Sequence, residues 1–174
     1  MNVRLTRCID LRERVAGVDL VDRLSAAAAQ RGLRVFLLGA QPGVAEATAA
    51  ILTARYPGLV IAGVYAGSPR PEDEDTIVAL IAQARPQILF VAYGAPKQDL
   101  WIGTHGAALG VPVMMGVGGS FDFIAGVQKR APRWVQRVNL EWFYRLVTQP
   151  WRWRRQLALP RFAWAVVFRR GTGD

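Results

Sequence analysis

Four short apolar runs alternate with longer stretches of helical character over the first two-thirds of the chain. The runs cover Arg34–Gly39, Val60–Tyr65, Ile88–Tyr93 and Val111–Val117. The stretches that favour helices cover residues 19–31, 43–56, 72–84 and 97–109, approximately. Continuous apolar runs of this length are typical of strands buried on both faces of a parallel sheet. The alternation therefore predicts an α/β fold, a parallel sheet with helices on both faces.

The positive charge of the chain is concentrated in its C-terminal part. Half of the 22 lysines and arginines lie between Lys129 and Arg170, where Glu141 is the one acid. With Asp174 at the terminus, residues 129–174 therefore carry the whole formal net charge of +9. Five of the six tryptophans are there too. We therefore expect two parts, an α/β body over residues 1–128 and a basic, Trp-rich helical appendage over residues 129–174. Such an appendage suits a membrane surface, a nucleic acid or a phosphorylated ligand.

Composition narrows the class of protein further. The chain has 174 residues, of which 52% are hydrophobic, which is enough for one domain with a hydrophobic core and a tail. Its single cysteine, Cys8, rules out an intrachain disulfide and fits a reducing compartment. The N-terminal residues show no apolar segment typical of a secretory signal, and no apolar run approaches the ~18–20 residues that span a bilayer. We therefore expect a protein that does not cross a membrane.

Three glycine-rich loops follow predicted strands. They are Gly39–Gly43, Gly94–Gln98 and Gly116–Asp122. Ligands of open parallel sheets bind beyond the carboxyl ends of the strands, and glycine lets the backbone approach them. Neither the dinucleotide fingerprint nor a P-loop is present. The convergence of the three loops on one edge predicts a nucleotide site, although each loop alone is equally typical of a tight turn.

An ordered series of motifs runs along the chain. The segments are Glu13–Asp19, Val35–Gly39, Tyr56–Gly58, Gly94–Gln98 with Trp101, Gly116–Phe123 with Ala125 and Gly126, Lys129–Pro132, Leu140–Leu146, and Pro150 with Arg152 and Arg155. Together they resemble the WecG/TagA/CpsF family of bacterial glycosyltransferases, with Asp99 where that family usually has Glu.

The resemblance implies a Rossmann-like body and an inverting enzyme that needs neither metal nor cofactor. Such an enzyme moves an N-acetylmannosamine-type sugar from a UDP-sugar donor to a polyprenyl-diphosphate-linked sugar acceptor. Its product enters teichoic acid, enterobacterial common antigen or exopolysaccharide synthesis. The resemblance also implies a cytoplasmic protein, peripheral at the inner face of the cell membrane, whose tail meets an anionic membrane surface.

The resemblance and the loops together give a set of expected substrate-binding residues. Several have structural alternatives: Arg14 could pair with Glu13 or Asp10, Gln98 or Asp122 could cap a helix, and Lys97 could be a solvated helix-start residue. The set comprises Arg14, Gly39, Gly94, Lys97, Gln98, Gly118, Gly119, Asp122, Arg145, Arg152 and Arg155.

The three tail arginines have a specific expected role. Arg145, Arg152 and Arg155 fall within about 80° on one continuous helical face. In the family that this chain resembles, arginines at this spacing close over the nucleotide diphosphate. A guanidinium group suits this task because it offers two parallel hydrogen-bond donors to phosphate and stays charged. The alternative is a solvated face beside a Trp-rich core helix. The tail aromatics could anchor at a membrane interface, or they could cover the body or a homo-oligomer interface.

Members of the family that this chain resembles have a further N-terminal part. That part supplies a strand and an Asp-Gly motif whose aspartate is the proposed general base. No catalytic residue is therefore identified here, and we expect little transferase activity from these 174 residues. Two other roles stay open. One is a non-catalytic UDP-sugar-binding or membrane-docking module; the other is a nucleic-acid-binding protein, although the sequence contains no recognised nucleic-acid-binding motif.

Two polar features are expected to be structural. His105, the only histidine, is expected to be a mid-helix or surface residue whose hydrogen bonds are satisfied. The acids Glu72–Asp75 are expected to mark the start of a helix rather than a metal site.

Overall fold

A computed structural model describes residues 16–128 and residue 132. Arg14, the tail arginines and the predicted helices of the appendage lie outside the described residues. The body-and-appendage boundary near residue 128 therefore stays a prediction.

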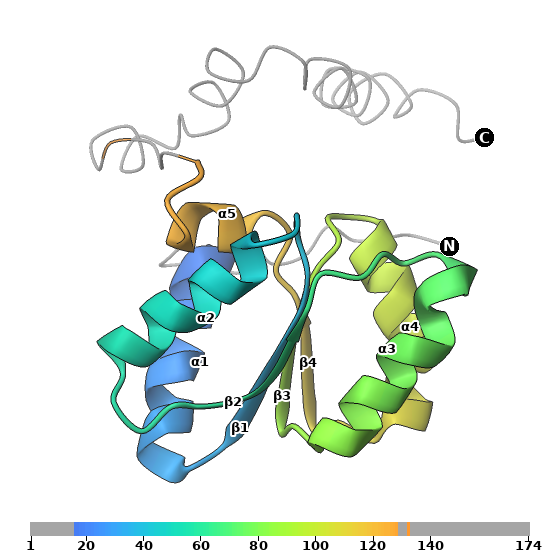
Figure 1. The fold of residues 1–174 in the computed structure, drawn as a ribbon, viewed down its shortest axis with the longest axis horizontal. Helices are drawn as coiled ribbons and strands as arrows, with labels where there is room; N and C mark the ends of the chain where they lie inside the picture. The colour runs from blue at the N-terminus through green and yellow to red at the C-terminus, as the bar shows by residue number, and fades with distance from the viewer. Residues whose placement is uncertain (1–15, 129–131, 133–174) are drawn as a thin grey trace, which may run out of the picture. The chain divides into compact units, whose positions relative to one another are not determined.

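The described residues form a four-stranded parallel sheet with helices on both faces (Figure 1). The strands are β1 (Arg34–Gly39), β2 (Val60–Tyr65), β3 (Ile88–Ala92) and β4 (Val113–Gly116), in the order β2-β1-β3-β4. The helices are α1 (Gly17–Arg31), α2 (Val44–Arg55), α3 (Pro71–Ala84), α4 (Lys97–Leu109) and α5 (Ser120–Ile124). The predicted Rossmann-like α/β fold is confirmed.

The helices divide between the two faces of the sheet, and a separate apolar core lies on each face. Helices α1, α2 and α5 cover one face, and α3 and α4 cover the other (Figure 1). Successive residues of a strand point to opposite faces. Leu37 of β1 accordingly packs into the first core and Leu38 into the second. All five residues of β3 are buried, as expected for a strand covered on both sides.

Local signals in the sequence explain where several helices begin and end. Pro71 opens α3, where its fixed φ angle fits and its missing N–H costs nothing, and the acids Glu72, Asp73 and Glu74 occupy the first turn. The acidic run is thus a helix start, as predicted. Helix α1 ends at Arg31 and is capped by Gly32, which takes the left-handed conformation that glycine adopts most easily.

The order of the strands locates the edge at which a ligand is expected. The chain passes from β1 outward to β2 and then crosses back to β3 on the other side of β1. The carboxyl ends of β1 and β3 therefore flank the point where the direction of winding reverses. In open α/β sheets, ligands bind in the crevice at this switch point.

Candidate functional site

The register of the sheet brings the three glycine loops together at its carboxyl edge. Gly39 at the end of β1 lies beside Ala92 of β3, and Val91 of β3 lies beside Gly116 at the end of β4. The ladder continues into the loops: the Ala40 N–H donates to the Ala92 carbonyl at 3.2 Å, and the Val117 N–H to the Val91 carbonyl at 2.8 Å. The expected convergence on one edge is therefore present in the fold.

Gln98 links two of these loops. It is the second residue of α4, and it is buried, with 7% of the residue's surface exposed. The Gln98 Oε1 accepts hydrogen bonds from the Gly94 N–H at 3.1 Å and from the Gly118 N–H at 2.8 Å. Gly94 belongs to the loop between β3 and α4, and Gly118 to the loop between β4 and α5. One side-chain oxygen thus holds two strand ends together.

Glycine at position 116 makes room for the Gln98 amide. A Cβ atom added to Gly116 would lie 2.5 Å from Nε2 and 2.8 Å from Cδ of Gln98. Real Cβ atoms do not approach other heavy atoms so closely, so a larger residue at position 116 would displace the amide. Gly94 and Gly118 have φ angles of 75° and 55°, in the left-handed region that favours glycine.

Two aromatic rings pack beneath the first two loops. The Tyr93 ring lies against Gly39, where an added Cβ would approach it to 2.9 Å, and it meets the Trp101 ring edge-on at 6.0 Å between centroids. Burial raises the pKa of the Tyr93 hydroxyl, and the charge of Asp73 raises it further. Among residues 16–128, this buried hydroxyl has no hydrogen-bond partner. Sequence reasoning did not single out Tyr93, because its only signal was its place at the end of a strand.

The loop after β4 also contacts the start of α1. A Cβ added to Gly17 would lie 2.9 Å from the Ser120 Oγ and 3.5 Å from the Val117 carbonyl oxygen. Ser120 begins α5 and donates its hydroxyl to the Val117 carbonyl at 2.6 Å. The first turn of α1 therefore stands at the same edge as the glycine loops.

Two other expected site residues lie in the first turns of helices at this edge. Lys97 is the exposed first residue of α4. Asp122 lies in the first turn of α5 and is half-buried, and the helix dipole favours an acid there. The N-cap residue of α5 is Gly119, and that of α4 is Pro96, so neither Asp122 nor Gln98 occupies an N-cap position.

The residues expected to bind substrate thus fall into two groups. Within the described part of the chain, Gly39, Gly94, Lys97, Gln98, Gly118, Gly119 and Asp122 all lie at or beside the carboxyl edge of the sheet. Arg14, Arg145, Arg152 and Arg155 lie outside the described residues. Their roles stay predictions.

His105 ties α4 to α3 on the second face. Its Nδ1 lies 2.8 Å from the Trp101 carbonyl oxygen, and its Nε2 lies 2.6 Å from Glu74 Oε1. Its ring stacks on Trp101 with centroids 4.7 Å apart. Burial lowers the pKa of His105, but the hydrogen bonds to Glu74 and to the Trp101 carbonyl together raise it above its ordinary value. The predicted satisfied mid-helix residue is what the structure contains.

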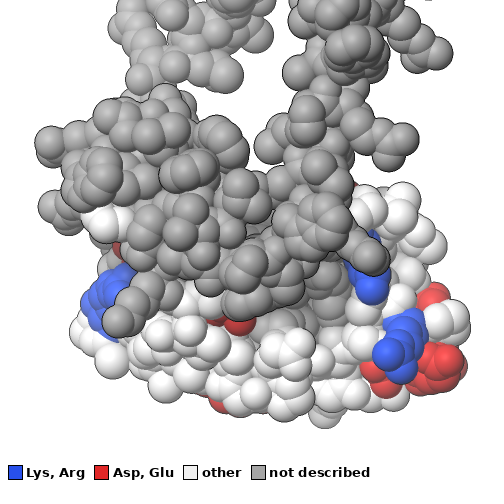
Figure 2. Space-filling view, turned by 90° about the horizontal axis from the view of Figure 1, so that it is seen from above, with Lys and Arg blue, Asp and Glu red and all other residues white. Residues whose placement is uncertain are grey.

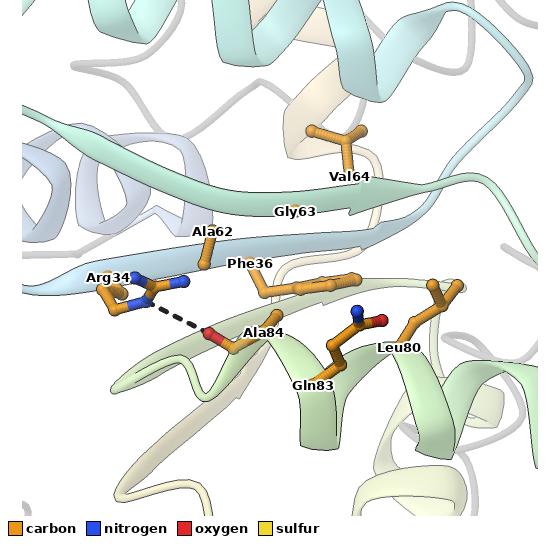
Figure 3. Close-up of a pocket in the computed structure, with 8 residues that line it drawn as sticks. All are labelled: Arg34, Phe36, Ala62, Gly63, Val64, Leu80, Gln83 and Ala84. Carbon is orange, nitrogen blue, oxygen red and sulfur yellow. Dashed lines mark hydrogen bonds between the residues drawn. The ribbon is translucent and has the colours of Figure 1, made fainter.

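A cavity of about 310 Å³ lies away from the glycine loops, between β2 and α3 (Figure 3). Its lining includes Arg34 at the start of β1, Gly63 in the middle of β2 and Ala84 at the end of α3. The Arg34 Nε donates to the Ala84 carbonyl at 3.1 Å. The cavity therefore extends toward the edge of the sheet opposite to the loops.

Figure 2, seen from above, shows acidic side chains at several places on the described residues, with the largest group at one end. The first turn of α3 holds three acids, Glu72, Asp73 and Glu74. In residues 16–128, no three His, Cys, Asp or Glu residues are grouped so that they could hold a metal ion. Of the helices the structure describes, none is both long enough and apolar enough to cross a membrane.

The fold and its glycine edge define an α/β protein of the Rossmann-like class, with loops gathered at the switch point where such proteins bind ligands. Comparison with known proteins then identifies the family. The glycosyl transferase WecG/TagA/CpsF family matches residues 3–173, so the chain belongs to that family.

Two relatives carry the name N-acetylglucosaminyldiphosphoundecaprenol N-acetyl-beta-D-mannosaminyltransferase. They come from Bacillus subtilis (strain 168) and Bacillus spizizenii (strain ATCC 23059 / NRRL B-14472 / W23). Each is 40% identical to this chain over 157 residues, which is 90% of this chain and 60% of the relative. The chain thus spans about 60% of the length of the curated relatives it matches.

Proposed function

We propose that the protein takes part in an inverting, metal-independent glycosyl transfer. An N-acetylmannosamine-type sugar would pass from UDP to a polyprenyl-diphosphate-linked N-acetylglucosamine. The observation that carries the proposal is the 40% identity to two enzymes named for transfer of N-acetylmannosamine to N-acetylglucosaminyl-diphosphoundecaprenol. The edge of glycine loops at the switch point supports it, because nucleotides bind in that place in sheets of this kind.

The UDP-sugar would lie across the carboxyl ends of β1, β3 and β4. Glycine at positions 39, 94 and 118 leaves the backbone without side chains there. Lys97, exposed at the start of α4, and the N–H groups of that first helical turn would favour a phosphate. Asp122 would accept hydrogen bonds from the ribose or the uracil.

The reaction requires charge to leave with UDP. The acceptor hydroxyl attacks the anomeric carbon from the face opposite UDP, loses its proton to a base, and the bond from that carbon to the phosphate oxygen breaks. The electron pair leaves with UDP, so the diphosphate gains negative charge. We propose that Arg145, Arg152 and Arg155 neutralise it, with Arg14 positioning the substrate, since fixed cations stabilise such charge in a site shielded from water.

The first experiment measures transfer and binding separately. The chain is incubated with UDP-N-acetylmannosamine and a polyprenyl-diphosphate-linked N-acetylglucosamine, and the product is followed by mass spectrometry and its anomeric configuration by NMR. We expect slow transfer at most from these 174 residues, and any product should have inverted configuration and form equally well in the presence of EDTA. Retention of configuration, or loss of activity with EDTA, would contradict the proposal. UDP binding without product would favour the alternative, a UDP-sugar-binding module that does not catalyse transfer.

A charge-reversal pair tests the arginine role. We expect Arg152→Glu to weaken UDP binding and any transfer by roughly tenfold or more, because a repulsive charge replaces an attractive one beside a diphosphate. Arg23→Glu is the matched control, since Arg23 is exposed on α1 and the formal charge changes equally. Equal UDP affinity and equal transfer rates for the two variants would show that Arg152 does not act on the nucleotide.

A further inference from the structure

The Gln98 amide is fixed in one orientation by the groups around it. The Gly94 and Gly118 N–H groups are both donors, and they converge on one atom of the side chain at 3.1 and 2.8 Å. That atom must therefore be the acceptor oxygen, which places the NH₂ group beside Gly116. The amide oxygen is engaged by the protein's own backbone.

This engagement changes what Gln98 can do for a ligand. An oxygen that already accepts two hydrogen bonds has no further lone pair suited to a substrate hydroxyl. Gln98 is also 93% buried, so most of its surface contacts protein rather than the open edge. The backbone N–H groups of Gly94 and Gly118, in contrast, lie in two separate loops at the carboxyl edge of the sheet.

We propose that Gln98 is a positioning residue that preforms the UDP-sugar site by holding the β3–α4 and β4–α5 loops together. The glycines at positions 94 and 118 allow the turns that aim both N–H groups at one oxygen, and Gly116 leaves the space that the amide fills. The identity of the ligand rests on the proposed function. The holding of the loops does not, because it is a property of the protein without ligand.

The sharpest test displaces the amide without changing Gln98. Gly116→Ala adds only a methyl group, and Gly116 is not among the residues with positive φ, so alanine fits the backbone there. The methyl group would lie 2.5 Å from Nε2 and push the amide away. Gly103→Ala is the matched control, because nothing lies within 4 Å of its added Cβ and alanine favours the α4 helix.

The first readout is amide hydrogen exchange in the protein without ligand. We expect exchange at Gly94 and Gly118 to accelerate roughly three- to tenfold in Gly116→Ala, the range that follows from loss of one ordinary hydrogen bond. Gln98→Met, which keeps the length of the side chain but has no strong acceptor, should give the same result. Gln98→Glu should keep exchange slow, because a carboxylate accepts both N–H groups. Unchanged exchange in Gly116→Ala and Gln98→Met would overturn the proposal.

The second readout is the affinity for UDP, measured by calorimetry well below the melting temperature of each variant. If the loops form the site, Gly116→Ala and Gln98→Met should bind UDP more weakly than the unaltered chain. The loss of affinity should be at least as many-fold as the increase in the exchange rates of Gly94 and Gly118. Gly103→Ala should bind UDP as tightly as the unaltered chain. A merely structural residue would lower the melting temperature and leave the UDP affinity unchanged, and that result would also overturn the proposal. Failure of the unaltered chain to bind UDP would contradict the proposed function instead, while the exchange rates would still decide whether Gln98 holds the loops.

Discussion

His105 lies between two hydrogen-bond acceptors, and this arrangement favours its protonated form. A carbonyl oxygen faces Nδ1 and a carboxylate faces Nε2. A neutral imidazole carries one N–H, so both contacts are satisfied only by the imidazolium, which donates from both nitrogens. This agrees with the raised pKa, in which the two hydrogen bonds together outweigh the effect of burial. The ion pair joins α3 to α4 on the face opposite α1 and α2.

The titration of His105 is a direct test of this geometry. Because the chain has one histidine, its imidazole NMR signals need no assignment, and we expect a pKa above the ordinary value of about 6.5. A pKa raised by folding contributes stability that is fully present below the unfolded value. That contribution is lost as the pH rises from about 6.5 through the folded pKa. Glu74→Gln should lower the pKa of His105, and a titration at or below 6.5 in the unaltered chain would contradict the ion pair.

At the level of single residues, the sequence predicted where side chains lie better than it predicted which groups they contact. The motif around Gly94–Gln98 predicted that Gln98 lies at the site. The bonds that Gln98 makes were not predictable, because Gly118 follows it by 20 residues and meets it only through the pairing of β3 with β4. Tyr93 was missed for a similar reason. Its buried hydroxyl becomes notable only when the residues that surround it are known.

Helix α5 is the element that most directly positions the third glycine loop. Its Phe121 is fully buried in the core beneath α1 and α2. The Phe121 carbonyl accepts a hydrogen bond from the buried Thr48 hydroxyl of α2 at 3.2 Å. A five-residue helix cannot hold itself in place by backbone hydrogen bonds alone. The loop before α5 therefore depends on this packing.

Removing the Phe121 ring should destabilise the body strongly. We expect Phe121→Ala to lower the free energy of unfolding by about 3–5 kcal/mol, the usual cost of deleting a buried ring and leaving a cavity. Urea denaturation followed by circular dichroism would measure it. Phe123→Ala, two residues away and only half-buried, is the control, and its loss should be clearly smaller. Equal losses would mean that Phe121 does not anchor α5.

At the level of elements, the sequence predicted the presence of all four described strands, but it predicted the residues at which β3 and β4 end less well. Predicted strands Arg34–Gly39 and Val60–Tyr65 have the observed bounds, whereas β3 ends one residue before the predicted Tyr93 and β4 is shorter than Val111–Val117. Apolar runs mark burial, and burial continues past the last ladder residue, as at the buried Val111 and Val117. Helix α5 was not predicted, because five residues are too few to show helical periodicity and Gly118 and Gly119 favour a loop.

At the scale of the whole molecule, charge separates the chain into unlike parts. Residues 1–128 are formally neutral, and residues 129–170 carry a large excess of Arg and Lys together with five tryptophans. The proposed acceptor is a lipid, so a protein that acts on it must reach a membrane. Basic residues near an anionic leaflet contribute on the order of 1 kcal/mol each, and indole rings favour the headgroup level.

We therefore propose that the C-terminal part binds an anionic membrane surface, and vesicle co-sedimentation tests it. The full chain should sediment with vesicles of phosphatidylglycerol and phosphatidylcholine, less with phosphatidylcholine alone, and less again as the salt concentration rises, because salt screens exposed charges. The double variant Arg169→Glu, Arg170→Glu should bind anionic vesicles several-fold more weakly. Its control, Arg23→Glu with Arg31→Glu, changes the net charge equally within α1 of the body. If both double variants lost binding equally, total charge rather than the basic C-terminal part would govern attachment, and the proposal would be wrong.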